Sequence, residues 1–184
     1  VILGGLSLLC YIGLEASMGG FVTTYLNDLG YDEDTAGKLL SGFWISLMVA
    51  RVIAGFGMWA AGTGLWLRAL LIVLLAMIAT GSIWAMVTAT EKVPGAIATI
   101  VTGLAFGPIF PGLVGVTWTK TDAFANGVAG STFSVIFCLG LAGAVGVPYF
   151  IGRASARSSI RHSLRIAVGV GCALIACTGV LFVL

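Results

Sequence analysis

Long apolar stretches alternate with short polar ones along the whole chain. A helix needs about 20 mainly apolar residues to cross the hydrocarbon core of a bilayer, and each of these stretches is long enough. The polar stretches between them hold most of the charged residues. The pattern predicts six membrane-spanning helices, over approximately residues 3–26, 38–60, 67–87, 95–118, 127–151 and 160–184.

Membrane-crossing β-strands do not fit the same pattern. A strand of a membrane barrel alternates apolar and polar residues over about ten positions, whereas these stretches are continuously apolar. Backbone groups surrounded by lipid must be hydrogen-bonded within their own segment, which favours helices. We therefore expect an all-α fold, a polytopic transmembrane helical bundle of six spans that forms a single domain.

Composition and charge point to the same class of protein. The chain has 184 residues, of which 59% are hydrophobic and 9% are charged, whereas soluble domains carry about 25% charged residues. The net charge is +2, and the basic residues form no stripe of the kind that binds nucleic acid. The cysteines lie within apolar stretches and lack the spacing of metal ligands, so we expect small buried hydrophobes and neither a metal site nor a cofactor. They are Cys10, Cys138, Cys172 and Cys177.

The chain begins at Val1, with no charged segment before the first apolar stretch. It is therefore unlike a secretory signal peptide. Because no initiator methionine is present, we interpret the chain as part of a longer protein whose N-terminal half precedes Val1.

Basic residues favour one side of the predicted membrane. An even number of spans places both chain ends on one side, together with loops 61–66 and 119–126. This side carries Arg68 and Lys120, whereas six basic residues fall on the opposite side. The positive-inside rule would place that opposite side in the cytoplasm. Its basic residues are Lys38, Lys92, Arg153, Arg157, Arg161 and Arg165.

Two charged residues, Glu15 and Arg51, lie well inside predicted spans. A charge at such a depth costs at least about 2.5–3.5 kcal/mol on insertion scales, which is a reason to expect a function. Tyr11 and Tyr25 lie on the helical face of Glu15. We predict that Glu15 carries the proton or contacts the substrate and that the two tyrosines line the path beside it. A low-dielectric environment favours the neutral form of a carboxyl group, so Glu15 is predicted to exchange protons as its access to water changes. The alternative is a glutamate that only hydrogen-bonds a neighbouring helix.

Three roles are open for Arg51. Its guanidinium group can pair with Glu15, bind an anionic group, or reach the membrane interface along its long stem. We favour a structural or gating role over direct contact with a substrate.

The fourth apolar stretch contains two prolines within a glycine-rich segment, Gly103 to Gly112. Proline removes a helix donor and kinks the helix, and broken helices at mid-membrane are common in transporters. We predict that this segment bends during function, and the alternative is a static kink. The predicted path and hinge residues are Gly103, Phe106, Gly107, Pro108, Phe110 and Pro111, with the two phenylalanines as candidates to stack on a ligand or to serve packing alone.

Four segments carry motifs: Tyr11-x-Gly13-x-Glu15-x3-Gly19-x-Phe21-x3-Tyr25, Ala50-Arg51-x3-Gly55, Gly103 to Pro111, and Gly140 to Gly152. In this order they resemble the seventh, eighth, tenth and eleventh helices of major facilitator superfamily transporters, especially the fucose–proton symporter group. The resemblance implies the C-terminal six-helix half of a twelve-helix transporter that works by alternating access. It also implies a sugar-like substrate, coupling to protons, a second six-helix half (upstream in the same chain or a homodimer mate), and a bacterial inner membrane as the location.

Three departures from the family limit what the resemblance implies. Gly55 and Gly62 keep the spacing of the family's loop motif, but Trp59 and Ala60 occupy the positions of its charged pair, so we expect no charge-based gate there. Glutamine is absent, and Asn27 and Asn126 lie near span ends, although sugar sites usually need side-chain amides. The family orientation places both chain ends in the cytoplasm, against the charge count. We follow the family, because upstream helices usually set the orientation.

Enzyme chemistry is not expected of this chain. Ser131 follows Gly130 but is not followed by the glycine of an intramembrane serine protease, His162 lies at a loop edge, and no glycine loop cradles phosphates. We therefore predict no catalytic residue, and a secondary active transporter that moves a small, sugar-like solute with protons. The alternatives are efflux of an amphiphilic compound, or a half-length structural or regulatory membrane protein without transport.

Overall fold

The computed structural model describes residues 1–60 and 64–183, without the side chains of residues 58–60. The described part of the chain is mainly helical and contains no strand. Six segments are long and apolar enough to cross a membrane, and two of them are each built from two helices, α4 with α5 and α7 with α8. The helices are α1 (Ile2–Asp28), α2 (Glu33–Ala60), α3 (Leu65–Thr88), α4 (Lys92–Phe106), α5 (Ile109–Lys120), α6 (Ala129–Ser155), α7 (Ile160–Ser163) and α8 (Arg165–Val183).

The predicted all-α bundle of six spans is therefore confirmed. The second helix begins at Glu33, several residues before the predicted start at residue 38. Its polar first turn is stabilised by the side chain of Asp32, whose Oδ2 accepts a hydrogen bond from the backbone N–H of Thr35 at 3.0 Å. This bond lowers the pKa of Asp32. Hydropathy alone misses such a turn, because its stability comes from the cap and not from lipid.

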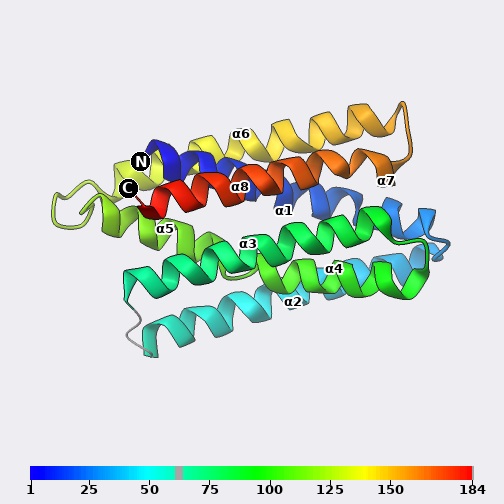
Figure 1. The fold of residues 1–184 in the computed structure, drawn as a ribbon, viewed down its shortest axis with the longest axis horizontal. Coiled ribbons are helices and arrows are strands. Elements are labelled where there is room, and N and C mark those ends of the chain that lie inside the picture. Colours follow the sequence, from blue (N-terminus) through cyan, green and yellow to red (C-terminus); the bar gives the residue numbers. More distant parts are fainter. Residues whose placement is uncertain (61–63, 184) are drawn as a thin grey trace.

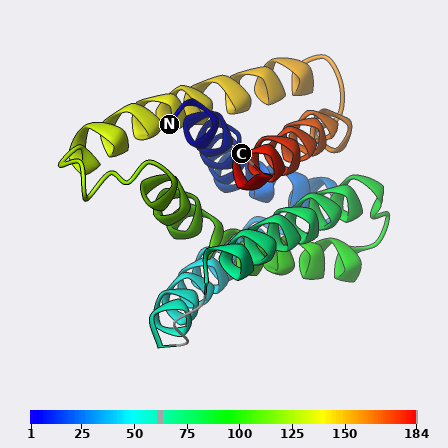
Figure 2. The same ribbon diagram turned by 60° about the vertical axis from the view of Figure 1, so that its left-hand side comes forward.

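The helices run side by side along the long axis of the molecule, and both chain ends lie at the same end of it (Figure 1). Helix α1 lies inside the bundle, between α6 and α8 (Figure 2). Helix α4 packs between α2 and α3, and α3 also contacts α8. Helices α4 and α5 follow one another and together cross the bundle once (Figure 1).

Helices α1 and α6 approach each other closely. A Cβ atom added at Gly143 would overlap the backbone carbonyl group of Leu9, and one added at Gly13 would overlap the side chain of Val147. Small residues at such crossings let helix backbones touch, which stabilises packing where lipid provides no hydrophobic drive. The glycines therefore set how deeply α1 sits in the bundle.

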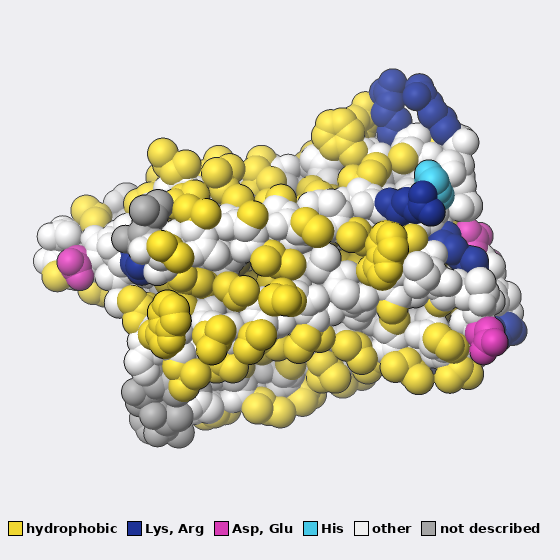
Figure 3. Space-filling view, viewed as in Figure 1, with side chains coloured by type: hydrophobic (Ala, Val, Ile, Leu, Met, Phe, Trp, Pro, Cys, Tyr) yellow, Lys and Arg dark blue, Asp and Glu magenta, His cyan; other side chains and the backbone are white. Residues whose placement is uncertain are grey.

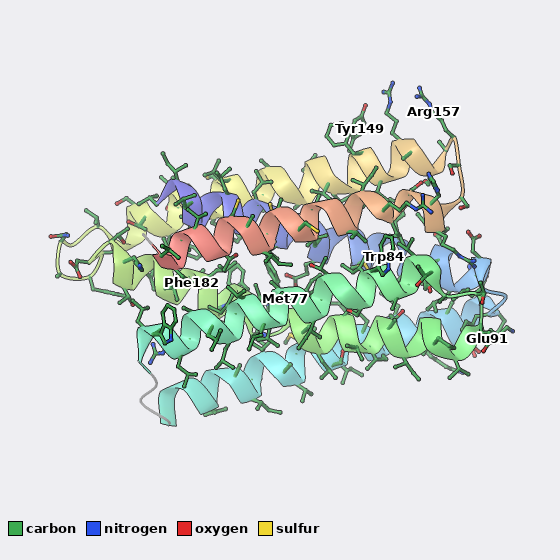
Figure 4. All side chains as sticks on the ribbon, viewed as in Figure 1. Met77, Trp84, Glu91, Tyr149, Arg157 and Phe182 are labelled. Carbon is green, nitrogen blue, oxygen red and sulfur yellow. The ribbon has the colours of Figure 1, made fainter. Side chains whose placement is uncertain are left out.

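The surface shows the division expected of a membrane protein. Large apolar side chains cover the middle of the face seen in Figure 3, and charged groups gather toward its two ends. Most of the Lys and Arg side chains on this face lie at the end opposite the chain termini (Figure 3). Arg157 and Tyr149 project from the bundle there (Figure 4). The membrane orientation stays a prediction.

A buried hydroxyl pair links α3 to α4, with 2.7 Å between the oxygens of Ser82 and Thr102. Replacing Ser82 by alanine is expected to lower the free energy of unfolding by about 0.6 kcal/mol, the average for such bonds within membranes. Unfolding in mixed micelles measures it, with Ser134→Ala as control, because Ser134 bonds only within its own helix. Equal losses for the two variants would contradict a role for the interhelical bond.

Candidate functional site

A cavity of about 380 Å³ lies where α1, α2, α5 and α6 meet. Helix α1 contributes Ile12, Glu15 and Ala16, whose spacing of three and four residues places them on one helical face. The volume is at the lower end of the range typical of small-molecule sites, about 300–1,000 Å³. The remaining lining residues are Trp44 and Arg51 of α2, Phe110 of α5 and Phe137 of α6.

Glu15 and Arg51 form an ion pair in this cavity, with 3.5 Å between Oε1 of Glu15 and Nη2 of Arg51. Their side chains are 18% and 30% exposed, respectively. Opposite charges held together reduce the cost of placing each one inside a membrane span. The structure thus brings together the two charged residues that stand inside predicted spans, and of the roles open to Arg51 it shows the pairing with Glu15.

The break between α4 and α5 leaves backbone carbonyl groups without their usual helix donors. Pro111 has no N–H to offer to the carbonyl group of Gly107, four residues earlier. Nε of Arg51 donates to that oxygen at 3.1 Å instead. The hydroxyl group of Tyr11 donates to the carbonyl oxygen of Phe106 at 3.1 Å, and itself accepts a hydrogen bond from Nη2 of Arg51 at 2.8 Å.

These bonds make Arg51 the centre of one connected polar network. It joins the carboxylate of Glu15 and the hydroxyl group of Tyr11 on α1 to the end of α4, across the helix break. Its guanidinium carbon also lies 5.5 Å from the centre of the Phe110 ring, within cation–π range. The carboxylate of Glu15 therefore contacts the same side chain that bonds the backbone at the break.

The two predicted phenylalanines differ in position. Phe110 lines the cavity, whereas Phe106 is fully buried against the rings of Tyr11 and Phe43. The ring of Phe106 serves packing, and only its carbonyl group takes part in the polar network. Of the two candidates for stacking on a ligand, Phe110 is the one that reaches the cavity.

The other predicted residues of the fourth span lie around the break. Gly103 packs against the backbone carbonyl group of Phe43, and Gly107 packs against that of Leu47, so both let α4 approach α2. Pro108 lines a different cavity of about 330 Å³, between α2, α3 and the break. Apart from Arg68, the described lining of this second cavity is apolar. Bending of the break during function stays a prediction.

Tyr25 lies away from the cavity. It is ten residues beyond Glu15 on α1, about 15 Å along the helix axis. Its ring is fully buried, and its hydroxyl group lies close to Gly95 at the start of α4. No described residue hydrogen-bonds that hydroxyl group. A shared helical face in the sequence therefore does not place Tyr25 with Glu15 and Tyr11.

Sequence reasoning missed two aromatic residues of the lining, Trp44 and Phe137. Trp44 lies two helical turns before Arg51 and thus on the same face of α2, a spacing that the sequence contains. Phe137 has no comparable signal, because only the packing of α6 against α1 brings it to the cavity.

The predicted loop motif that begins at Gly55 falls partly outside the description. The side chains of Trp59 and Ala60 and the whole of Gly62 are among the residues that are not described. The predicted loss of a charge-based gate there stays a prediction.

Neither the family models nor the curated proteins searched include a match to this chain.

Proposed function

We propose that this chain is one half of a proton-coupled secondary transporter of the major facilitator type. The observation that carries the proposal is the ion pair between Glu15 and Arg51, set in a cavity within membrane spans and tied to a broken helix. Ionisable residues inside membrane spans characteristically mark the paths of ions and solutes. Helices interrupted within the membrane are a recurring part of transporter binding sites.

The surface beside the cavity supports a second half. Along α1, Gly19 and Thr23 follow Glu15 at spacings of four residues, and both are small or polar and partly exposed. The outer face of α3 instead exposes large apolar side chains such as Leu74 and Met77. The apolar face of α3 can face lipid at little cost, whereas the small and polar face of α1 is better covered by protein. In the proposal a second six-helix half, from the same chain or a second copy, covers α1 and closes the cavity.

The coupling works through the charge of Glu15. An ionised Glu15 attracts Nη2 of Arg51, and a protonated Glu15 no longer does so. Because Nε of Arg51 holds the carbonyl oxygen of Gly107, a shift of the guanidinium group alters the support of the α4–α5 break. The inward- and outward-facing states would hold Arg51 in different positions. Protonation of Glu15 would therefore change the relative populations of the two states.

A sugar-like solute and a bacterial inner membrane follow from the family resemblance and belong to the proposal on that ground alone. Efflux of an amphiphilic compound is the second candidate. One observation favours it: apart from Glu15 and Arg51, the described residues that line the cavity are apolar or aromatic.

Replacing Glu15 by glutamine is expected to abolish solute-driven proton movement, because glutamine takes up no proton. The protein is reconstituted in liposomes that contain a pH-sensitive dye. Fucose, ethidium and benzoate are then offered in turn, to represent a sugar, an amphiphilic cation and a small acid. The matched control is Glu91→Gln, since Glu91 lies exposed just before α4, as Figure 4 shows.

Unchanged proton movement in Glu15→Gln would remove Glu15 from the coupling role. A wild-type protein that moves neither protons nor any of the three solutes would contradict transport and favour a structural or regulatory membrane protein.

A further inference from the structure

We propose that the solute is a monocarboxylate with a small, largely aromatic body, and that its carboxylate replaces the side chain of Glu15 on Arg51. This inference rests on the proposed function and names the substrate class of the same site. It departs from the sugar that the family resemblance implies.

The charge of the lining selects a single negative charge. Arg51 is the one base and Glu15 the one acid among the described residues that line the cavity. With Glu15 protonated, the guanidinium group keeps a positive charge without an ionic partner, in a setting where an unpaired charge is costly. One carboxylate restores neutrality, whereas a doubly charged phosphate group would leave a net negative charge.

The geometry of Arg51 leaves room for this exchange. Its contact with Glu15 measures 3.5 Å, longer than the usual 2.7–2.9 Å of a charge-assisted hydrogen bond. Nε is held by Gly107, and Nη2 also by Tyr11. Nη1 makes no hydrogen bond to another described residue. The edge formed by Nη1 and Nη2 thus offers the paired donors that bind a carboxylate in a bidentate manner.

The body of the solute is set by the rest of the lining. Trp44, Phe110 and Phe137 present aromatic rings, and Ile12 and Ala16 complete an apolar wall. No side-chain amide or aliphatic hydroxyl group is found among the described lining residues. A buried sugar hydroxyl without a partner loses its hydrogen bonds to water. An aromatic ring gains from the same surfaces.

The inference predicts competition between Glu15 and the ligand for Arg51. When the side chain at position 15 carries no negative charge, Arg51 is free of this contact and a carboxylate binds it more tightly. The titratable and charged groups that face Glu15 are Tyr11 on its own helix and Arg51 on α2. Helices α5 and α6 contribute Phe110 and Phe137 to the described lining, and neither titrates.

Binding of benzoate to the protein in lipid nanodiscs tests the inference by calorimetry, with benzamide as its neutral isostere. We expect benzoate to bind at least about tenfold more tightly than benzamide, since a buried charge pair distinguishes them. Glu15→Gln, whose amide carries no negative charge to compete for Arg51, should bind benzoate at least as tightly as the wild type does.

Arg51→Lys keeps the charge but offers no fork of paired donors, and we expect it to bind benzoate more weakly than the wild type. The control Arg153→Ala alters an exposed arginine at the end of α6 and should bind like the wild type. Equal affinity of the wild type for benzoate and benzamide, or no binding of benzoate, would overturn the inference. The comparison of the two ligands needs no variant, so a misfolded variant does not obscure it.

Failure of this inference differs from failure of the proposed function. Proton-coupled uptake of fucose without benzoate binding would refute the carboxylate class and keep transport. Benzoate binding without movement of solute or protons across liposomes would refute transport and keep the binding site.

Discussion

Gly143→Ala is expected to lower the free energy of unfolding of the bundle by about 2 kcal/mol or more, within the range for overpacked sites. The added Cβ would overlap the backbone carbonyl group of Leu9 on α1. Because the atoms it meets are backbone atoms, no change of side-chain rotamer can relieve the clash. Helices α1 and α6 must separate, which loosens the most extensive interface of the bundle.

Unfolding of the purified protein in mixed micelles measures this effect, and Gly146→Ala is the matched control. Gly146 lies on the same helix, and beyond its chain neighbours and its own helix backbone an added Cβ atom meets nothing within 4 Å. The control should be neutral or slightly stabilising, since alanine favours helix over glycine by about 1 kcal/mol. A loss in Gly146→Ala as large as that in Gly143→Ala would show that helix propensity, and not the α1–α6 contact, governs the result.

Arg51→Ala is expected to abolish transport and to destabilise the protein by about 2 kcal/mol. Removing one partner of a fully buried ion pair costs about 3–5 kcal/mol. The lower value takes account of the partial exposure of both side chains, 18% and 30%, which weakens the pair. The substitution also leaves the carbonyl oxygen of Gly107 without its donor at the helix break.

Arg51→Lys separates the contribution of the positive charge from that of the hydrogen bonds, because lysine keeps the charge but lacks the planar set of donors. We expect it to recover part of the stability but little of the transport, as measured by micelle unfolding and by uptake into liposomes. A variant Arg51→Ala with wild-type stability and uptake would contradict the central place of Arg51 in the network. Full recovery of uptake by lysine would show that the charge alone is required.

Much of the site is visible in the sequence because charges inside apolar stretches are rare. Glu15 and Arg51 stand out for that reason, and Pro108 and Pro111 mark the position where the structure interrupts the fourth span. Both features are local properties of the chain. A proline lacks its N–H whatever surrounds it, and a charge within a long apolar stretch is placed in the membrane by that stretch alone.

The arrangement of these residues depends on how the helices rotate and cross. The sequence shows that Tyr11 and Tyr25 share a face with Glu15, yet only Tyr11 joins the network, because α1 meets α2 and the helix break at that level. Phe137 enters the cavity from a distant helix, without any signal in its own segment. Such contacts depend on how the helices pack against one another, and the periodicity of a single helix does not specify that packing.

The amino-acid sequence by itself determined the number of spans, the all-α class and the position of the two charges within apolar segments, because these depend on the length and polarity of continuous segments. The tertiary structure alone decided that Arg51 holds both Glu15 and the carbonyl group of Gly107, and that aromatic rings from three helices surround the pair. The physical reason is that lipid selects segments by their hydrophobicity, whereas partners are selected by contact between the surfaces of helices far apart in the chain.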